Sequence, residues 1–392
     1  MKKPMAAHSM TTRLVPPSTW ALVLGAWAVV GLFAAFGGRW LAAPIDATVA
    51  ACVFGGLFVT ILAASFGVVH QADHLAHQLG EPYGTLILTL SIVSIEVILI
   101  ASVLLGPGEF PTIGRDSIFA VMMIILNLVM GICLVAGAAR HGEQEYNAQG
   151  AVTYLSMIVL LTGTALVLPR FLSGAGEFTR TQAIAMGVLT ALLYAAFLYK
   201  QMGSHRWLFI QPATGAMAIP DDDAARAGPG TSAGAAGGAI DRWAVLVRSM
   251  VLLALILPIV LLAHHLAVVT DYGIAAMGAP AAVGGVLIAI IVFTPESITA
   301  VKAAMHNEMQ RAINLCLGAF VSTVGLTVPA VLAIGLVTGK QVILGISAME
   351  TVLFVLTVAL TVQTFNGQRT SPIQGFMHIG LFAVFGLLLF KP

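Results

Sequence analysis

Two acidic residues, Glu96 and Glu296, lie deep inside hydrophobic segments of this 392-residue chain, each in an otherwise uncharged run of more than twenty residues. An ionisable side chain at bilayer depth is costly, so it indicates a functional site. A hydroxyl residue, Ser94 or Thr294, lies two positions before each glutamate. Carboxylate and hydroxyl oxygens are the ligands that hard cations prefer. These four residues therefore predict a cation site, unless the two hydroxyls only bond carbonyls of their own helices.

The same two carboxylates can also carry protons. Burial disfavours the charged form of a carboxylate, whereas a bound cation favours it. Protons and metal ions would therefore compete, and a site built on Glu96 and Glu296 would hold one or the other. Acids that only hydrogen-bond neighbouring helices are the structural alternative.

Four further residues are candidates for lining or supporting the ion pathway. Pro295 removes an amide donor directly before Glu296 and frees a carbonyl one turn upstream, which favours a discontinuous helix at the site. Asn127, Ser322 and Thr323 lie in other apolar runs. Such polar residues either line a pathway or connect helices to one another.

Three histidines precede the segment of Glu96. His70, His74 and His77 have the spacing that places them on one face of a short helix, beside Asp73. Histidine titrates near neutrality and ligates metals, so this face is a candidate for pH sensing or cation collection. An exposed interfacial helix explains the same residues equally well.

The composition is that of a polytopic membrane protein. Hydrophobic residues make up 59% of the chain and charged residues 9%, whereas soluble domains have about 25% charged residues. The net charge of +1 and the absence of a Lys/Arg-rich block give no sign of nucleic-acid binding. Cys52, Cys133 and Cys316 lie in apolar runs without metal-type spacing and are predicted to be small core residues.

The apolar runs predict an all-α protein with about eleven transmembrane helices. Each run is long enough to cross a bilayer, and the runs are continuously apolar rather than alternating, which favours helices over strands. The predicted spans are 19–37, 47–68, 84–105, 117–138, 150–169, 182–199, 243–267, 280–301, 312–337, 343–363 and 373–390. With the N-terminus inside, eleven Lys and Arg lie on the cytoplasmic side and six on the other, so an N-in orientation is favoured.

A Gly-, Ala- and Ser-rich stretch at 201–242 predicts a flexible cytoplasmic linker between two halves, with Asp221, Asp222 and Asp223 as solvated acids. Residues 1–46 would form an N-terminal tail and one extra helix that is retained rather than cleaved. Residues 47–200 and 243–392 would then be two five-helix repeats. Because five is odd, the repeats would be inverted in the membrane, an arrangement typical of transporters.

Two stretches, 70–97 and 293–329, resemble the two alpha repeats of the calcium/cation antiporter superfamily. The closest resemblance is to its proton-coupled branch, the bacterial ChaA-type calcium/proton and sodium-potassium/proton antiporters. That family carries a Gly-Asn-x-x-Glu element, whose glutamates would be Glu96 and Glu296. Its Gly-Asn part is replaced by Ile-Val at 92–93 and by Val-Phe at 292–293.

The resemblance also reaches the helices that follow each glutamate. The spacing from Gly318 to Pro329 fits the family pattern, with Ser322 at the position of the family's glutamine and Asn127 at that of its asparagine. The resemblance implies an antiporter of the bacterial inner membrane that exchanges a cytoplasmic cation for an external proton by alternating access. Calcium is the first expected substrate, with sodium or potassium next.

Two other classes remain open alternatives. A channel or uniporter would use the same carboxylates but conduct without proton movement. An intramembrane enzyme is disfavoured because no HExxH pair, GxSxG nucleophile or GxGD acid pair is present, and no nucleotide-binding loop indicates ATP-driven pumping. We expect no cofactor, and the expected partners are inorganic cations, protons and the lipid bilayer. The oligomeric state and the complete ligand set do not follow from the sequence.

Overall fold

The computed structural model describes residues 15–42, 44–79, 83–106, 110–172, 176–212, 242–367 and 369–390. The N-terminal tail and most of the predicted linker, with its three aspartates, lie outside these ranges. Within them, nine helices are long and apolar enough to cross a membrane, and two shorter apolar helices are Thr89–Leu104 and Ala348–Thr364. Each of the eleven predicted spans corresponds to one of these helices, which confirms the all-α membrane fold.

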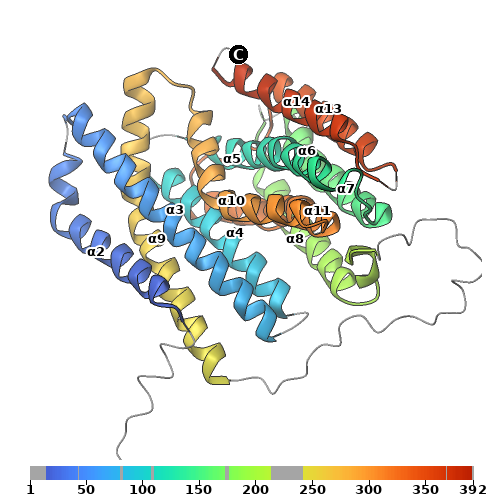
Figure 1. Ribbon diagram of the computed structural model, residues 1–392. Coiled ribbons are helices and arrows are strands. Elements are labelled where there is room, and N and C mark those ends of the chain that lie inside the picture. Colours follow the sequence, from blue (N-terminus) through green and yellow to red (C-terminus); the bar gives the residue numbers. More distant parts are fainter. Residues whose placement is uncertain are drawn as a thin grey trace, which may run out of the picture.

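The chain forms one extra helix followed by two series of helices in the same order (Figure 1). The extra helix is α2 (Pro17–Trp40). The first series is α3 (Ala47–Leu79), α4 (Tyr83–Leu104), α5 (Ile113–Met122), η1 (Met123–Val129), α6 (Met130–His141), α7 (Ala148–Thr162), η2 (Gly163–Val167), η3 (Leu168–Phe171) and α8 (Arg180–Met202). After η4 (Arg206–Phe209), the second series is α9 (Arg242–Met277), α10 (Ala282–Met305), α11 (Met309–Ser322), η6 (Thr323–Thr327), α12 (Val328–Thr338), α13 (Ala348–Thr364) and α14 (Pro372–Phe390).

Each series places a long helix first, a glutamate-bearing helix second and a helix interrupted by π-helical turns third. The long helices are α3 and α9, the glutamates lie on α4 and α10, and the π-helical turns are η1 and η6. This order is the one expected of two related halves. We call the side of the protein where α8 ends and α9 begins the linker side, and the opposite side the far side.

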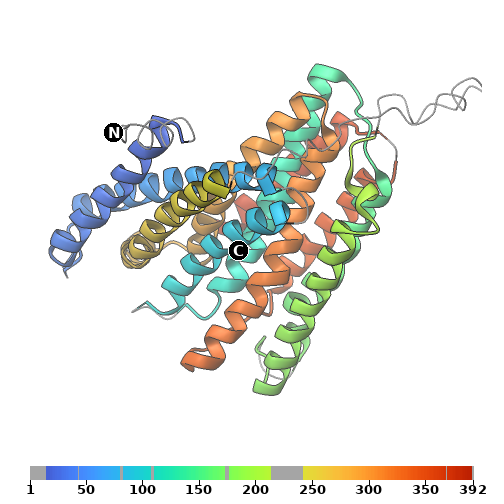
Figure 2. The ribbon, with the colours of Figure 1, turned by 90° about the horizontal axis from the view of Figure 1, so that it is seen from below.

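The two long helices differ most from their predicted bounds, because both continue well beyond the apolar core of their spans. α3 reaches Leu79 and α9 reaches Met277. They pack against each other, and α2 packs on both (Figures 1 and 2). The contact is close at Gly67, where a Cβ atom would lie 2.6 Å from a Leu22 methyl carbon and 2.8 Å from one of Leu255. Ala72 and Leu75, beyond the predicted end of α3, are buried together with Leu252 of α9.

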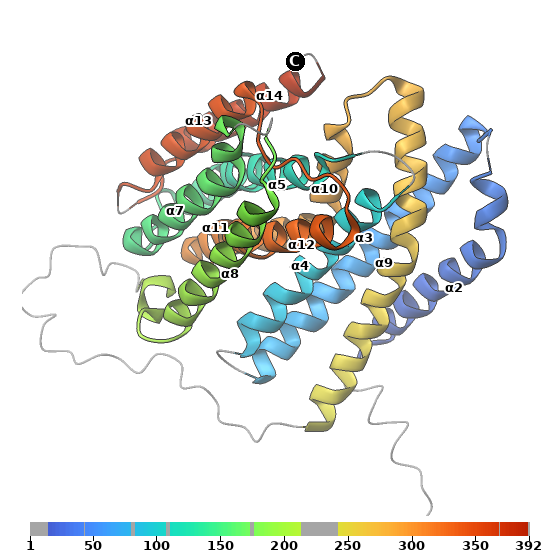
Figure 3. The ribbon, with the colours of Figure 1, turned by 180° about the vertical axis from the view of Figure 1, so that it is seen from behind.

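Helix α10 lies at the centre of the bundle, in contact with α3, α4, α5, α6 and α11 (Figure 3). Its approach to α5 depends on Gly285, because a Cβ atom there would lie 2.6 Å from backbone atoms of Asp116 and Ser117. Of the three cysteines, Cys133 and Cys316 are buried as predicted, but Cys52 is exposed on α3. The central position of α10 brings Glu296 close to elements of both halves.

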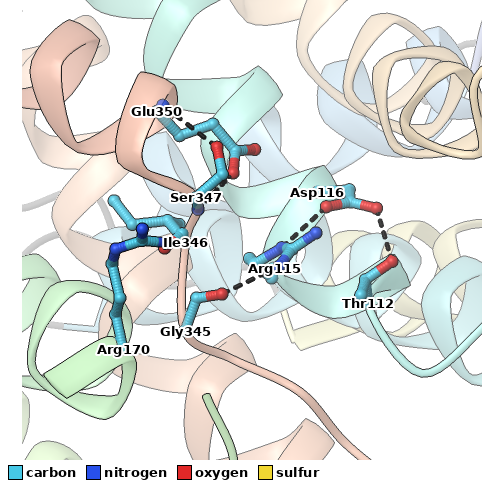
Figure 4. A network of polar contacts seen from close by, with 8 residues as sticks. All are labelled: Thr112, Arg115, Asp116, Arg170, Gly345, Ile346, Ser347 and Glu350. Carbon is cyan, nitrogen blue, oxygen red and sulfur yellow. Dashed lines mark hydrogen bonds and ion pairs between the residues drawn. The ribbon is translucent and has the colours of Figure 1, made fainter. Parts of the chain in front are cut away.

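A polar network on the far side joins the two halves (Figure 4). Arg115, at the start of α5, donates from Nη1 to the Gly345 carbonyl at 2.8 Å and from Nε to Asp116 Oδ1 at 2.9 Å. Arg170, after α7, donates to the Ile346 carbonyl at 3.3 Å. Ser347 and Glu350 then form the capping box that begins α13. The segment before α13 is therefore held against α5 and α7.

Candidate cation site

Glu96 and Glu296 meet in the interior of the bundle, although 200 residues separate them in the sequence. Glu96, on α4, is fully buried, and Glu296, on α10, is 9% exposed. The two helices pack together, and the two carboxyl groups are close enough to interact electrostatically. The sequence predicted that both would serve one site, and the structure brings them together.

The π-helical turn η6 supplies the hydroxyls that face Glu96. Thr323 Oγ1 donates to Glu96 Oε2 at 3.1 Å, and Thr327, at the other end of η6, faces the same carboxyl group. Short π-helical segments occur frequently at functional sites because they re-aim side chains within a helix. Thr323 was a candidate from the sequence. Thr327 was not, although its position two residues before Pro329 in an apolar run is a signal that could have identified it.

Three oxygens at this site are buried and lack a hydrogen-bond partner among the described residues. They are Glu96 Oε1, Glu296 Oε2 and Thr327 Oγ1. Buried polar atoms in native proteins are nearly always hydrogen-bonded, so a cluster of unpaired oxygens indicates a place for a ligand. Acceptor oxygens from two carboxyl groups and a hydroxyl suit a proton or a hard cation.

A cavity of about 330 Å³ leads from Glu296 to the linker side. Ser322 and Gly318 line it near Glu296, and Arg206, Arg311 and Asn314 line it near η4 and the start of α11. Ser322 itself donates to the Ala319 carbonyl at 2.7 Å. Ser322 therefore lies on the wall of this cavity, as lining a pathway, one of its two predicted roles, requires.

Ser94 and Thr294 both bond carbonyls of their own helices. Ser94 donates to the Leu90 carbonyl at 2.6 Å, and Thr294 donates to the Ile290 carbonyl at 2.5 Å. Residues two positions apart on an α-helix point in nearly opposite directions, and Thr294 lines an apolar groove on another face of α10. The hydroxyls that face Glu96 are thus Thr323 and Thr327, not the pair that precedes the glutamates in sequence.

Pro295 does not interrupt its helix, contrary to the prediction of a discontinuous helix there. α10 is a single α-helix from Ala282 to Met305 that contains Pro295. The Pro295 carbonyl accepts a hydrogen bond from Thr299 Oγ1 at 3.0 Å. The irregular backbone near the site lies instead in the π-helical turns η1 and η6 of neighbouring helices. Neither turn contains a proline.

Asn127 connects helices rather than lining the cavity. From η1 it donates through Nδ2 to Thr357 Oγ1 at 3.0 Å, and its Oδ1 lies 3.2 Å from His378 Nδ1. All three residues are fully buried. His378 was missed in the sequence, although a histidine inside the apolar run 373–390 is a signal for such a contact. Asn127 thereby ties η1 to α13 and α14.

The histidines lie at the linker-side end of α3 and not on a separate short helix, because α3 is continuous from Ala47 to Leu79. The rings of His70 and His74 meet edge to face with centroids 4.5 Å apart. The side chain of His77 lies outside the described part of the chain. His70 and His74 do not line the cavity that reaches Glu296, and the role of the three histidines in pH sensing stays a prediction.

Comparison with known proteins places this site in a family. The profile of a family described as sodium/calcium exchanger protein matches residues 49–203 and 248–391. The chain belongs to this family. A putative ionic transporter, y4hA of Sinorhizobium fredii, is 36% identical over 83% of this chain and 85% of its own length. The sodium-potassium/proton antiporter ChaA of Escherichia coli is 33% identical over 85% of this chain and 87% of its own length.

Solved structures share the fold of this exchanger-family member. Native YfkE matches with a TM-score of 0.70 and 17% identity, covering 95% of this chain and 100% of that chain. The H+/Ca2+ exchanger CAX matches with a TM-score of 0.64 and 12% identity, covering 96% of this chain and 89% of that chain. The family and these relatives are transporters, so the protein is a membrane cation exchanger and not an enzyme.

Proposed function

We propose that this exchanger moves cations against protons through Glu96 and Glu296. The observation that carries the proposal is the group of three buried oxygens on Glu96, Glu296 and Thr327 that have no hydrogen-bond partner within the described ranges. Two carboxylates offset the charge of a divalent cation, and the Thr323 and Thr327 hydroxyls with water supply further oxygen ligands. When the cation leaves, protons on the same carboxyl oxygens keep the buried site neutral.

Calcium is the proposed substrate because two acidic groups match a divalent charge. Sodium and potassium are the second candidates, supported by the 33% identity to the Escherichia coli sodium-potassium/proton antiporter. Calcium/proton exchange is supported by the Ca(2+)/H(+) antiporter of Synechocystis, which is 24% identical over 86% of this chain. A uniporter would use the same oxygens without moving protons in exchange.

The two sides of the site differ in access, which supports alternating access. The linker-side cavity reaches Glu296, whereas the Arg115 and Arg170 contacts hold the far side together. We take this as the state open to the linker side. In the bacterial inner membrane, with the N-terminus in the cytoplasm, that side would be cytoplasmic and would load the outgoing cation.

Everted membrane vesicles containing a pH-sensitive dye test this function. Respiration acidifies the lumen, and addition of a transported cation should dissipate the proton gradient. We expect Ca²⁺ to act at a lower concentration than Na⁺ or K⁺, and vesicles without the protein to show no response. A cation flux that leaves the proton gradient unchanged would favour the uniporter instead.

A further inference from the structure

A second, smaller cavity lies on the far side of the glutamates. Its wall includes Leu99, three residues beyond Glu96 on α4, and Ile291, five residues before Glu296 on α10. Both positions are on the far-side flank of the glutamates, since α4 runs towards the far side and α10 runs away from it. The cavity therefore lies beyond the carboxyl groups, towards the far side, and shares no lining residue with the linker-side cavity.

This far-side cavity is nearly closed. Its volume is about 20 Å³, against about 330 Å³ on the linker side. A single water needs roughly 10–15 Å³ of such space, so the cavity has room for about one water. The difference in size is what a transporter closed on this side would have.

Of the described residues that line the far-side cavity, Asp271, near the far-side end of α9, alone has an ionisable side chain. Apart from Thr270, the other lining residues are apolar or glycine. The Asp271 Oδ2 atom is buried and has no hydrogen-bond partner in the described part of the chain. The neighbouring Tyr272 hydroxyl donates to the Ile45 carbonyl at 2.8 Å and fixes this end of α9 beside the start of α3.

We propose that Asp271 is a far-side binding station for the transported cation, an inference that rests on the proposed function. A cation that leaves the glutamates towards the far side meets an apolar passage, where an unpaired charge is costly. Within the described part of the chain, Asp271 is the one carboxylate on the wall of the far-side cavity, and its free oxygen can accept the ion there. As the far-side cavity widens, the ion passes from the glutamates to Asp271 and then to solvent.

The test is one-sided transport by the full-length protein in proteoliposomes, with protein orientation read from a cleavable C-terminal tag. Ca²⁺ alone is titrated on one side at a time. In Asp271→Asn the half-saturating Ca²⁺ concentration should rise about tenfold on the far side, equivalent to ~1.4 kcal/mol, and stay unchanged on the linker side. Asp271→Ser should give the same one-sided shift, and Asp271→Glu should restore most of the far-side affinity.

Glu177→Gln is the matched control, because Glu177 is a far-side acid that does not line either cavity. Its Ca²⁺ affinities on the far side and on the linker side should both match those of the wild type. A wild-type far-side affinity in both charge-free Asp271 variants would overturn the proposal, as would an equal shift on both sides. Wild-type exchange is measured in the same preparation. If the wild-type protein shows no exchange, the proposed function is contradicted. If it does show exchange, the comparison of the variants tests the role of Asp271.

Discussion

The hydroxyl of Thr323, in the second half of the chain, donates a 3.1 Å hydrogen bond to the carboxyl group of Glu96 in the first half. This contact crosses the interface between the two series of helices at the site where their glutamates meet. Thr323 is the first residue of the π-helical turn η6 and Thr327 is the last. Both side chains face the same carboxyl group. A side chain of one half thereby contacts the buried carboxyl group of the other.

Loss of this hydroxyl should weaken cation binding without unfolding the protein. Thr323→Val keeps the shape of the side chain but removes a hydrogen bond to a charged group, worth about 1.5–3 kcal/mol. We expect the half-saturating cation concentration to rise at least about tenfold. Thr323→Ser should behave like the wild type, and Thr294→Val is the control, because its hydroxyl bonds its own helix. Equal affinities for the Val and Ser variants would contradict the role of Thr323.

Cation affinity should fall as the pH is lowered. In the proposed mechanism protons and metal ions compete for the same carboxyl oxygens, so each proton released on binding would lower apparent affinity about tenfold per pH unit below the range where the site titrates. If both carboxyl groups release a proton, affinity falls more steeply with decreasing pH than if only one does. Because the two groups interact, the observed titration describes the pair and not either residue alone. Half-saturating concentrations measured from about pH 6 to pH 9 check this. A flat profile would mean that these groups carry no protons.

The histidines at the end of α3 provide the control for this pH dependence. Replacing His70, His74 and His77 by Gln should shift the midpoint of the profile only modestly and preserve its slope, because His70 and His74 do not line the cavity that reaches Glu296. Loss of the pH dependence in the triple variant would mean that the histidines, and not the glutamates, are responsible for the proton sensitivity.

Arg115 should matter for stability as well as for closure of the far side. Arg115→Gln loses the bonds to Gly345 and Asp116 and leaves a buried acid without its cation, so we expect a loss of about 2 kcal/mol or more in the free energy of unfolding. Arg369→Gln removes an exposed ion pair to Glu145, which is worth at most about 1 kcal/mol. Thermal unfolding in detergent measures both. A smaller effect at Arg115 than at Arg369 would contradict this interpretation.

Hydropathy and charge were sufficient to predict the membrane fold and the pair of central carboxylates. Each apolar run became a helix because a bilayer leaves few other options for the backbone. Glu96 and Glu296 stood out because charge is rare at that depth. The family resemblance pointed to the same two residues, and the profile match confirms the family.

The ligand geometry did not follow from the sequence, because it depends on contacts between distant helices. Proximity in sequence suggested Ser94 and Thr294, but helical rotation turns them away from the glutamates. The π-helical turn that presents Thr327 contains no proline, although Pro329 follows Thr327 by two residues, and Pro295 leaves its own helix unbroken. The partners of Asn127 on α13 and α14 likewise lie more than two hundred residues away in sequence.

The most direct test of the account is simultaneous measurement of cation uptake and proton counterflow by purified protein in proteoliposomes. Wild-type protein should move protons in exchange for Ca²⁺, or for Na⁺ or K⁺, whereas Glu96→Gln and Glu296→Gln should each reduce both fluxes to the level of empty liposomes. Gln keeps the shape of the side chain but removes its charge and its exchangeable proton, and unchanged elution on size exclusion would establish that the variants are folded. Coupled exchange that persists in either variant would contradict the two-carboxylate site.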